Sequence, residues 1–497
     1  MSGNVERLLA EYSYLLQKTG DEQNQWKDCR LNRSFPASVV HPILKTGILR
    51  LFIPHRYGGL NATVHDCLKM LDISAYHALP MSLLMGINGA LFIQPVAKYA
   101  EPNVAEEIFK RYRNEPVMGG LMITEPEYGS DALHMETFYQ THKDGFDVKG
   151  KKHWAGLTGV ADYWLITARE KHDTGRLGRD VSFFIHDNSK PGITVEELYN
   201  NAGLYMLPYG RNRVDIRVPG TYKLVPETTG ISIMLDTLHR SRLQFPGMAI
   251  GFLRRLLDEA LVHVNQRVVG KKKLLEYEQV QYRISGLQTN FMVSSAMCIY
   301  SGSFADISNN TVPMDLQANI IKAVVTDMMQ ESAQSYQQLC GAMGYQTDHL
   351  AFSGIADSRP FQIFEGSNDI LYQQIYESAI KYVKQKKLTS LNSLIRSHPF
   401  LKDSTWLLNE DIGLEQNAIN QSRQVQLGKA IGRVACMSLL QRYTADLFPE
   451  RMLSSAMDDL KEDIAAMISA FKKNSPKKID SYFNSSETDW FTITRSM

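Results

Sequence analysis

The sequence predicts a mainly helical protein with a central β-domain and a C-terminal helical extension. Apolar residues recur at helical spacing before and after a segment in which β-branched and aromatic residues alternate with polar ones between Gly and Pro. Two more amphipathic segments then follow a polar stretch. We therefore expect an N-terminal helical domain at 1–115, a middle β-domain at 116–225, a C-terminal helical bundle at 226–388 and an extension at 389–497.

The composition limits which partners the protein can be expected to bind and in which cellular compartment it is expected. The chain has 497 residues, with 54 basic against 53 acidic ones and no block of five like charges, so nothing in its charge favours a nucleic-acid partner. Its five cysteines lie far apart without a Cys-x-x-Cys pair, which indicates neither a disulfide framework nor a metal site. No apolar run approaches the roughly 18 residues that span a membrane. We expect a soluble or at most peripheral protein in the cytoplasm.

The first two domains carry clear local signals. Leu8, Leu9, Tyr12, Leu15 and Leu16 form a stripe at helical spacing, which predicts that the chain begins with a helix. In the middle domain Asp144-Gly145 separates two alternating runs, which predicts a β-hairpin. The residues 145–151 also fit a phosphate-binding loop, but Lys152 replaces its Ser or Thr and no helix is expected to follow. We therefore interpret this segment as a strand.

The last two units are predicted to be helical. Apolar stripes at a 3.6-residue period run through 253–264 and 316–328, and Pro246-Gly247 should start or kink the first of these helices. The extension has amphipathic segments at 427–439 and 452–471. The second precedes four lysines, which are typical of either a solvated helix end or a membrane-surface contact: Lys472, Lys473, Lys477 and Lys478.

The strongest chemical signal is Glu365, a lone carboxylate between Phe364 and Gly366 in an otherwise apolar run. Burial raises the pKa of a carboxyl group because it disfavours the charged form, and such a group can act as a general base near neutral pH. A Glu-Gly pair is also common where a helix or loop ends. Other motifs are needed to decide between these alternatives.

The run Glu-Gly-Ser-Asn-Asp-Ile-Leu at 365–371 resembles the segment that carries the catalytic glutamate of acyl-CoA dehydrogenases, most closely their very-long-chain branch. The resemblance covers roughly residues 35–375 and, more weakly, the extension. It implies a helical domain, a β-barrel-like middle domain and a helical bundle, with FAD bound between the last two. No Gly-x-Gly-x-x-Gly opens a strand-to-helix unit, but the resembled family binds FAD without a Rossmann domain.

Two motifs of the middle domain fit the same family. Thr-Glu-Pro-Glu-Tyr-Gly-Ser-Asp at 124–131 resembles its most specific signature, which implies that Thr124 and Ser130 bind FAD and that Ser130 also meets substrate. Lys-His-Trp-Ala-Gly at 152–156 resembles the segment whose Trp packs on the flavin, a role that Trp154 fits. Gly156 replaces the family's Thr, and Trp-x-Gly looks more like the acyl-CoA oxidases.

The resemblance also implies contacts in the bundle. Arg267, Gln338 and Gly341 match residues that reach the FAD of a neighbouring subunit, although Val269 and Ala342 depart from the pattern. Three further positions follow from the resemblance, namely a cofactor contact at Ser367 and substrate contacts at Arg242 and Gly366. Relatives whose base lies on another helix carry it at the position of Ser241, so the base here is expected to be Glu365.

These motifs imply FAD-dependent α,β-desaturation of an acyl thioester carried on coenzyme A or on an acyl-carrier protein. Glu365 would remove the α-proton while the β-hydride passes to flavin N5. The expected partners are an electron-accepting flavoprotein and a second copy of the chain in a homodimer. Gly156 leaves open an oxidase that uses O₂, and the departures at Gly156, Val269 and Ala342 leave open a catalytically silent binding or assembly module.

Overall fold

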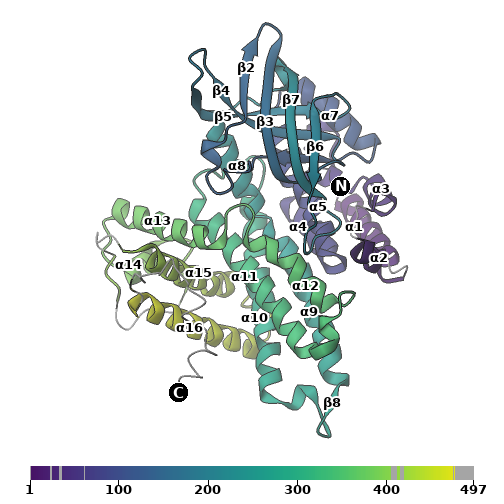
Figure 1. Cartoon of the computed structure of the whole chain (residues 1–497). Helices are drawn as coiled ribbons and strands as arrows, with labels where there is room; N and C mark the ends of the chain where they lie inside the picture. Colours follow the sequence, from purple (N-terminus) through teal and green to yellow (C-terminus); the bar gives the residue numbers. More distant parts are fainter. Residues whose placement is uncertain are drawn as a thin grey trace, which may run out of the picture.

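The computed structural model describes residues 2–22, 25–32, 36–60, 62–404, 411–414, 419–473 and 475. Helices come first, a sheet follows, and helices form the remainder of the chain (Figure 1). This is the predicted fold class, with a central curled sheet between helical regions and a helical extension after them.

The N-terminal region is helical, as its apolar periodicity predicts. Leu9, Tyr12 and Leu16 of the expected first helix are buried, and Leu8 and Leu15 pack against the same core. The helices are α1 (Ser2–Gln17), α2 (Gln25–Asn32), α3 (Ala37–Lys45), α4 (Val64–His77), α5 (Leu79–Gly86), α6 (Gln94–Tyr99) and α7 (Pro102–Asn114). A π-helical segment, η4 (Ile87–Ile93), joins α5 to α6.

The continuous helical segment Leu79–Tyr99 corrects one expectation. Its 21 residues contain an 18-residue window with a mean hydropathy of 1.4, so the segment is long and apolar enough to cross a membrane, although no run of that length was expected. Of its most apolar window, 94% is buried inside the protein. Because a core helix passes the same test of length and composition, the segment is weak evidence for a membrane span.

A seven-stranded sheet occupies the middle of the chain. Its strands are β1 (Gly119–Met122), β2 (Phe138–His142), β3 (Gly145–Gly156), β4 (Tyr163–Lys171), β5 (Leu177–Asp187), β6 (Ile193–Leu198) and β7 (Tyr209–Pro219). They run in the order β1-β4-β2-β3-β7-β6, with β5 paired to β4. The hairpin predicted at Asp144-Gly145 is confirmed, because β2 and β3 pair antiparallel and His142 lies opposite Gly145. The residues 145–151 thus lie in a strand, and the phosphate-loop alternative is excluded.

The second helical region packs its apolar stripes inward. Leu253, Leu256, Ala260 and Val264 of the first stripe are buried. The apolar residues of the second stripe are buried as well, namely Leu316, Ile320, Ile321, Val324, Val325 and Met328. The helices are α8 (Gly230–Arg242), α9 (Phe245–Gln266), α10 (Glu278–Phe304), α11 (Asp315–Cys340), α12 (Leu350–Ser358) and α13 (Asn368–Lys386). Pro246 lies in the first turn of α9, where a missing N–H costs no helical hydrogen bond.

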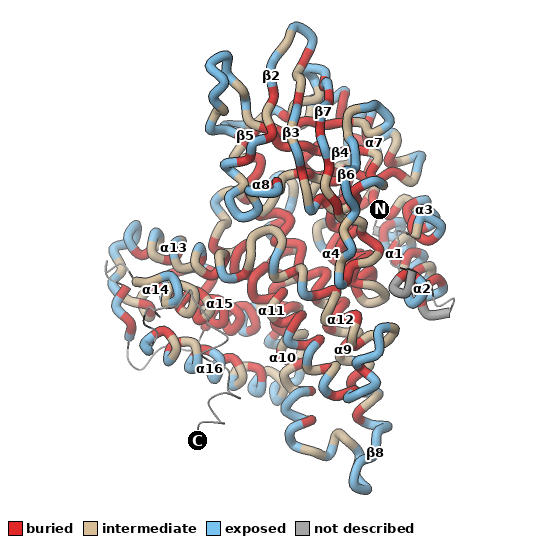
Figure 2. Tube along the Cα trace, in the orientation of Figure 1, coloured by how far each residue is buried: buried red, intermediate tan, exposed pale blue. Residues whose placement is uncertain are grey.

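The extension adds helices to the same core. It contains α14 (Leu391–Ser397), α15 (Gln421–Tyr443) and α16 (Glu450–Lys473). α15 packs on α13 and α10, and α16 packs on α15 and α10. The buried positions, red in Figure 2, therefore continue from α11 into α15. Lys472 and Lys473 end α16, whereas Lys477 and Lys478 of the predicted basic cluster lie outside the described residues.

Candidate active site

A cavity of about 1230 Å³ lies where the sheet meets the second helical region. Ligand pockets of about 300 to 1,000 Å³ hold one small molecule, so this cavity has room for a large cofactor together with a substrate. Its wall comes from η4, the sheet, α8, the start of α11, α13 and the loop before α13. The residues used below are Ile87, Thr124, Ser130, Trp154, Gly156, Tyr209, His239, Arg242, Asn319, Glu365 and Gly366.

Glu365 presents its carboxyl group to this cavity from a strained turn. Its φ of 54° lies in the left-handed region that non-glycine residues rarely adopt, and Gly366 follows at 94°. Ser241 Oγ donates to Glu365 Oε1 at 2.7 Å. Oε2 is shielded from solvent and has no hydrogen-bond partner within the described part of the chain. Glu365 therefore lines the site with one carboxylate oxygen left unpartnered by the described residues.

Burial raises the pKa of the Glu365 carboxyl group, because the charged form loses its hydration. The hydrogen bond from Ser241 and the positive charges of Arg242 and Lys322 act in the opposite direction. A carboxyl whose pKa moves toward neutrality is suited to proton abstraction, since it is ionised at working pH yet is a stronger base than a free carboxylate.

Two buried cations hold the backbone of this turn. Arg242 donates to the Glu365 carbonyl from Nη2 at 2.7 Å and from Nε at 3.2 Å, and its Nη1 donates to Asn319 Oδ1 at 2.6 Å. Lys322 Nζ donates to the Gly366 carbonyl at 2.8 Å. Both carbonyls of the strained pair are thus fixed by charged donors, which form stronger hydrogen bonds than neutral ones.

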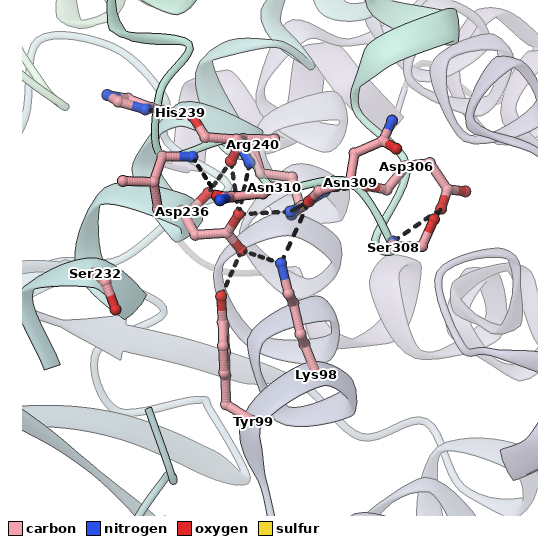
Figure 3. A network of polar contacts seen from close by, with 12 residues as sticks. Lys98, Tyr99, Ser232, Asp236, His239, Arg240, Asp306, Ser308, Asn309 and Asn310 are labelled. Atoms are coloured by element: carbon pink, nitrogen blue, oxygen red, sulfur yellow. Dashed lines mark hydrogen bonds and ion pairs between the residues drawn. The ribbon is translucent and has the colours of Figure 1, made fainter. Parts of the chain in front are cut away.

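A polar network anchors α8, the helix that supplies Ser241 and Arg242 (Figure 3). Asp236 is buried, and its Oδ2 accepts from Lys98 Nζ at 3.1 Å and from Tyr99 Oη at 3.0 Å. Its Oδ1 accepts from Arg240 Nη2 and from Thr311 Oγ1, both at 2.7 Å. The network joins α8 to α6 and to the loop before α11, and so fixes the helix that carries the neighbours of Glu365.

His239 lies next to this network and also lines the cavity. Its Nδ1 is 2.9 Å from the Thr311 carbonyl, which can only accept, so Nδ1 carries the proton. Burial lowers the pKa of His239, and the ring is therefore neutral near pH 7. Nε2 is left as an acceptor.

The opposite wall of the cavity comes from the sheet. The loop 124–131 is held by a buried ion pair, in which Lys152 Nζ lies 2.8 Å from Glu125 Oε1, and His153 N donates to Thr124 O at 2.9 Å. Trp154 has a φ of 54° and leaves 53% of its surface exposed, although its ring lies 4.5 Å from that of Tyr199. A large aromatic surface on the wall of a cavity is a platform for a planar ligand.

The predicted site residues divide into two groups. Thr124, Ser130, Trp154, Arg242, Gly366 and Glu365 all line the cavity. Ser367 lies beside it as the N-cap of α13. Arg267, Gln338 and Gly341 are exposed and do not line it; Arg267 lies beside the β8 hairpin (Val268–Val269), and Gln338 and Gly341 lie at the C-terminal end of α11. Their predicted contacts were with a neighbouring subunit's FAD, and they stay predictions.

Sequence reasoning missed several residues of the site. Lys322 was not singled out, although it interrupts the apolar stripe of α11 and is fully buried. A lysine in a buried stripe is a usable signal, because lysine is almost never buried without a partner. Asn319 and Tyr209 carried no signal in the sequence. Ser241 was noted only as the absence of a carboxylate, whereas the structure makes it a direct partner of Glu365.

Three family models match the chain in order. They are described as the acyl-CoA dehydrogenase N-terminal domain at residues 15–114, middle domain at 120–215 and C-terminal domain at 228–380. Among curated relatives, an acyl-CoA dehydrogenase of Bacillus subtilis is 23% identical over 68% of this chain and 88% of its own length. "Probable acyl-CoA dehydrogenase FadE10" of Mycobacterium tuberculosis is 27% identical over 69% of this chain and 55% of its own length.

Solved structures share the fold at lower identity. Butyryl-CoA dehydrogenase from Megasphaera elsdenii superposes with a TM-score of 0.67 and 19% identity, over 75% of this chain and 97% of its own. A prolyl acyl carrier protein oxidase, AnaB, reaches 0.67 with 17% identity, over 75% and 98%. The very-long-chain branch inferred from the sequence stays a prediction. Family membership does support the predicted cofactor, FAD, and an oxidoreductase activity, and the chain belongs to the acyl-CoA dehydrogenase family.

Proposed function

We propose that this protein desaturates the α,β-bond of a saturated acyl thioester with FAD as its cofactor. The observation that carries the proposal is the Glu365 carboxylate, which lines a large cavity opposite Trp154 and keeps one oxygen without a hydrogen-bond partner in the described structure. A carboxylate oxygen that no described group occupies is available to accept a proton.

The cavity fits the cofactor. Thr124 and Ser130 supply hydroxyl groups on one wall, Trp154 supplies an aromatic face, and the volume of about 1230 Å³ leaves room beyond it. These residues would hold FAD, with Ser367 near the start of α13. When bound, FAD supplies the acceptor for the hydride that leaves the β-carbon. Replacing both Thr124 and Ser130 by Ala is expected to weaken FAD binding, measured as flavin retained after dialysis.

The chain's own residues perform the proton chemistry. Ionised Glu365 takes the α-proton through its carboxylate, while Ser241 holds Oε1 in place. The backbone N–H of Glu365 donates to no other described group, and so it is free to donate to the thioester oxygen as negative charge develops there. Arg242 keeps that backbone rigid through the Glu365 carbonyl. The double bond forms as the α-proton and the β-hydride leave together or in sequence.

The test is the visible spectrum of the purified protein before and after anaerobic addition of saturated acyl-CoAs of increasing chain length. Flavin absorbance that bleaches with one range of chain lengths supports the proposal and identifies the substrate. A flavin that stays oxidised with every acyl-CoA and every acyl-carrier protein thioester contradicts it. Glu365→Gln is the control, since it should bind the same thioesters without bleaching.

A second candidate is an oxidase that passes its electrons to O₂. Gly156 lines the cavity where the family carries Thr, and a Cβ there would meet Ile87 Cδ1 at 2.8 Å. Position 156 therefore offers no hydroxyl to a bound flavin, and a larger side chain there would require Ile87 to move. Oxygen consumption with stoichiometric peroxide during turnover would favour the oxidase. Reduction of an added electron-transferring flavoprotein under the same conditions would favour the dehydrogenase.

Four expectations about partners and cellular location belong to this proposal. An electron-accepting flavoprotein is the proposed acceptor, and a homodimer is proposed because Arg267, Gln338 and Gly341 lie outside this chain's own cavity. A cytoplasmic location is proposed from the reduced, dispersed cysteines. Contact with a membrane surface rests only on the lysines at and beyond the end of α16. A silent module is disfavoured, because the Glu365 carboxylate, its hydrogen-bond partners and the cavity occur together.

A further inference from the structure

Lys322 is a buried cation without an acidic partner. Its side chain is fully buried in α11, and no carboxylate lies within ion-pair distance of Nζ among the described residues. Nζ instead donates to the Gly366 carbonyl at 2.8 Å and to Asn368 Oδ1 at 3.0 Å. Burying a charge in this way is costly, so the position calls for a reason beyond packing.

The polar groups around Lys322 orient Asn368 so that its side-chain oxygen accepts a hydrogen bond from Nζ. Asn368 Nδ2 donates to Asp327 Oδ1 at 2.6 Å and to Thr326 Oγ1 at 3.0 Å. A carboxylate can only accept, so the amide orientation is fixed and Oδ1 must face Lys322. Asp327 is itself occupied by Tyr372 and Gln362. It therefore forms no direct ion pair with Lys322.

Lys322 lies behind the Glu365 turn rather than in the cavity. Glu365 and Gly366 line the cavity, but Lys322 does not. The groups that act on its charge are Glu365 from the loop, Arg242 from α8 and Asp327 from its own helix. Burial lowers the pKa of Lys322 to about 7, and the charge of Glu365 opposes that shift. The coupling is reciprocal, because Lys322 lowers the pKa of the Glu365 carboxyl.

We propose that Lys322 is a positioning residue for the base, which fixes the Glu365-Gly366 turn and supplies positive charge that favours the ionised carboxylate. Two effects meet in one side chain. The hydrogen bond to the Gly366 carbonyl holds the strained backbone, and the ammonium charge acts on Glu365 without touching substrate. The inference rests on the proposed function, since it assigns Lys322 a role in that proton transfer.

The test separates charge from hydrogen bonding. Lys322→Met removes both, and Lys322→Gln removes the charge but keeps an N–H donor. The loss of this charge should raise the midpoint pH of the acid limb of the flavin-reduction rate in both variants. We expect a rise of about 1 unit, the low end for a nearby opposite charge, because Ser241 and Arg242 act more strongly on Glu365. Below the limb the rates should fall about tenfold, and they should recover at higher pH. Wild-type behaviour of Lys322→Gln would overturn the proposal.

A matched control accounts for loss of stability. Arg433 is another buried cation, whose Nε lies 2.8 Å from Asp463 Oδ2 in the extension, away from the cavity wall. Arg433→Met should lower the melting temperature and leave the acid limb where it is. If Arg433→Met moves the limb as far as the Lys322 variants do, the shift reflects general loosening and the inference fails.

A second readout does not depend on turnover. The infrared band of protonated Glu365, identified by its loss in Glu365→Gln, can be titrated in the resting protein. Its midpoint should rise by about 1 pH unit in Lys322→Met. An unchanged midpoint overturns the inference whether or not the protein reduces its flavin. A raised midpoint in a protein that no thioester bleaches supports the inference about Lys322 and contradicts the proposed function.

Discussion

Ser241→Ala tests how the site controls its base. The substitution removes the hydroxyl that donates to Glu365 Oε1 at 2.7 Å. Hydrogen bonds to charged groups contribute about 1.5 to 3 kcal/mol, and one pKa unit corresponds to about 1.4 kcal/mol. The hydrogen bond favours the ionised carboxylate. Its loss should therefore raise the pKa of Glu365 by about 1 to 2 units.

The assay is the rate of flavin reduction by a saturated acyl thioester across pH, measured anaerobically. In the proposed mechanism ionised Glu365 is the reactive form, so a higher pKa shifts the acid limb to higher pH. Rates below the limb should fall about ten- to a hundredfold and should approach the wild-type rate above it. Substrate affinity should change little, since Ser241 is not in the cavity lining.

Ser294→Ala is the matched control for this experiment. Ser294 is fully buried in α10, and its hydroxyl has no hydrogen-bond partner within the described part of the chain. Removing it breaks no bond and should leave the pH profile unchanged. An acid limb in Ser241→Ala that coincides with those of wild type and Ser294→Ala would refute the reasoning that this hydrogen bond sets the pKa of the base.

Three further outcomes are expected. Glu365→Gln keeps an acceptor for the Ser241 hydroxyl and should retain FAD. Its rate of flavin reduction, measured by stopped-flow spectroscopy, should fall by about 10² to 10⁴-fold. Loss of the flavin's yellow colour would argue against Glu365 as the base. Gly366→Ala places a Cβ on a residue with a φ of 94°, 3.0 Å from Leu371 Cδ2. Denaturant titration should show that the free energy of unfolding falls by about 1 to 3 kcal/mol. An unchanged denaturation midpoint would be inconsistent with a strained turn. Asp236→Ala leaves the buried Arg240 without its carboxylate partner. The free energy of unfolding should fall by about 3 to 5 kcal/mol. A decrease below about 1 kcal/mol would mean that the network does not anchor α8.

Local signals in the sequence were sufficient for the fold and part of the site. Apolar periodicity predicted the buried stripe of α11, and Asp144-Gly145 predicted the hairpin, because both depend on residues that are neighbours in the chain. The motif resemblance placed Thr124, Ser130 and Glu365, which the structure brings to one cavity. It also assigned Arg267, Gln338 and Gly341 to a neighbouring subunit's FAD, and these three residues do not line this cavity.

The sequence by itself indicated that Glu365, a carboxylate in an apolar run, is a candidate for burial, and the motif resemblance predicted that it is the base. Only the tertiary structure decided what acts on that carboxylate. Ser241 is 124 positions away from Glu365, and Lys322 is 44 positions away from Gly366. Helix packing brings them together, and no pattern in one segment encodes a contact with another. The pKa of the base depends on those contacts, so it is a property of the fold and not of the motif.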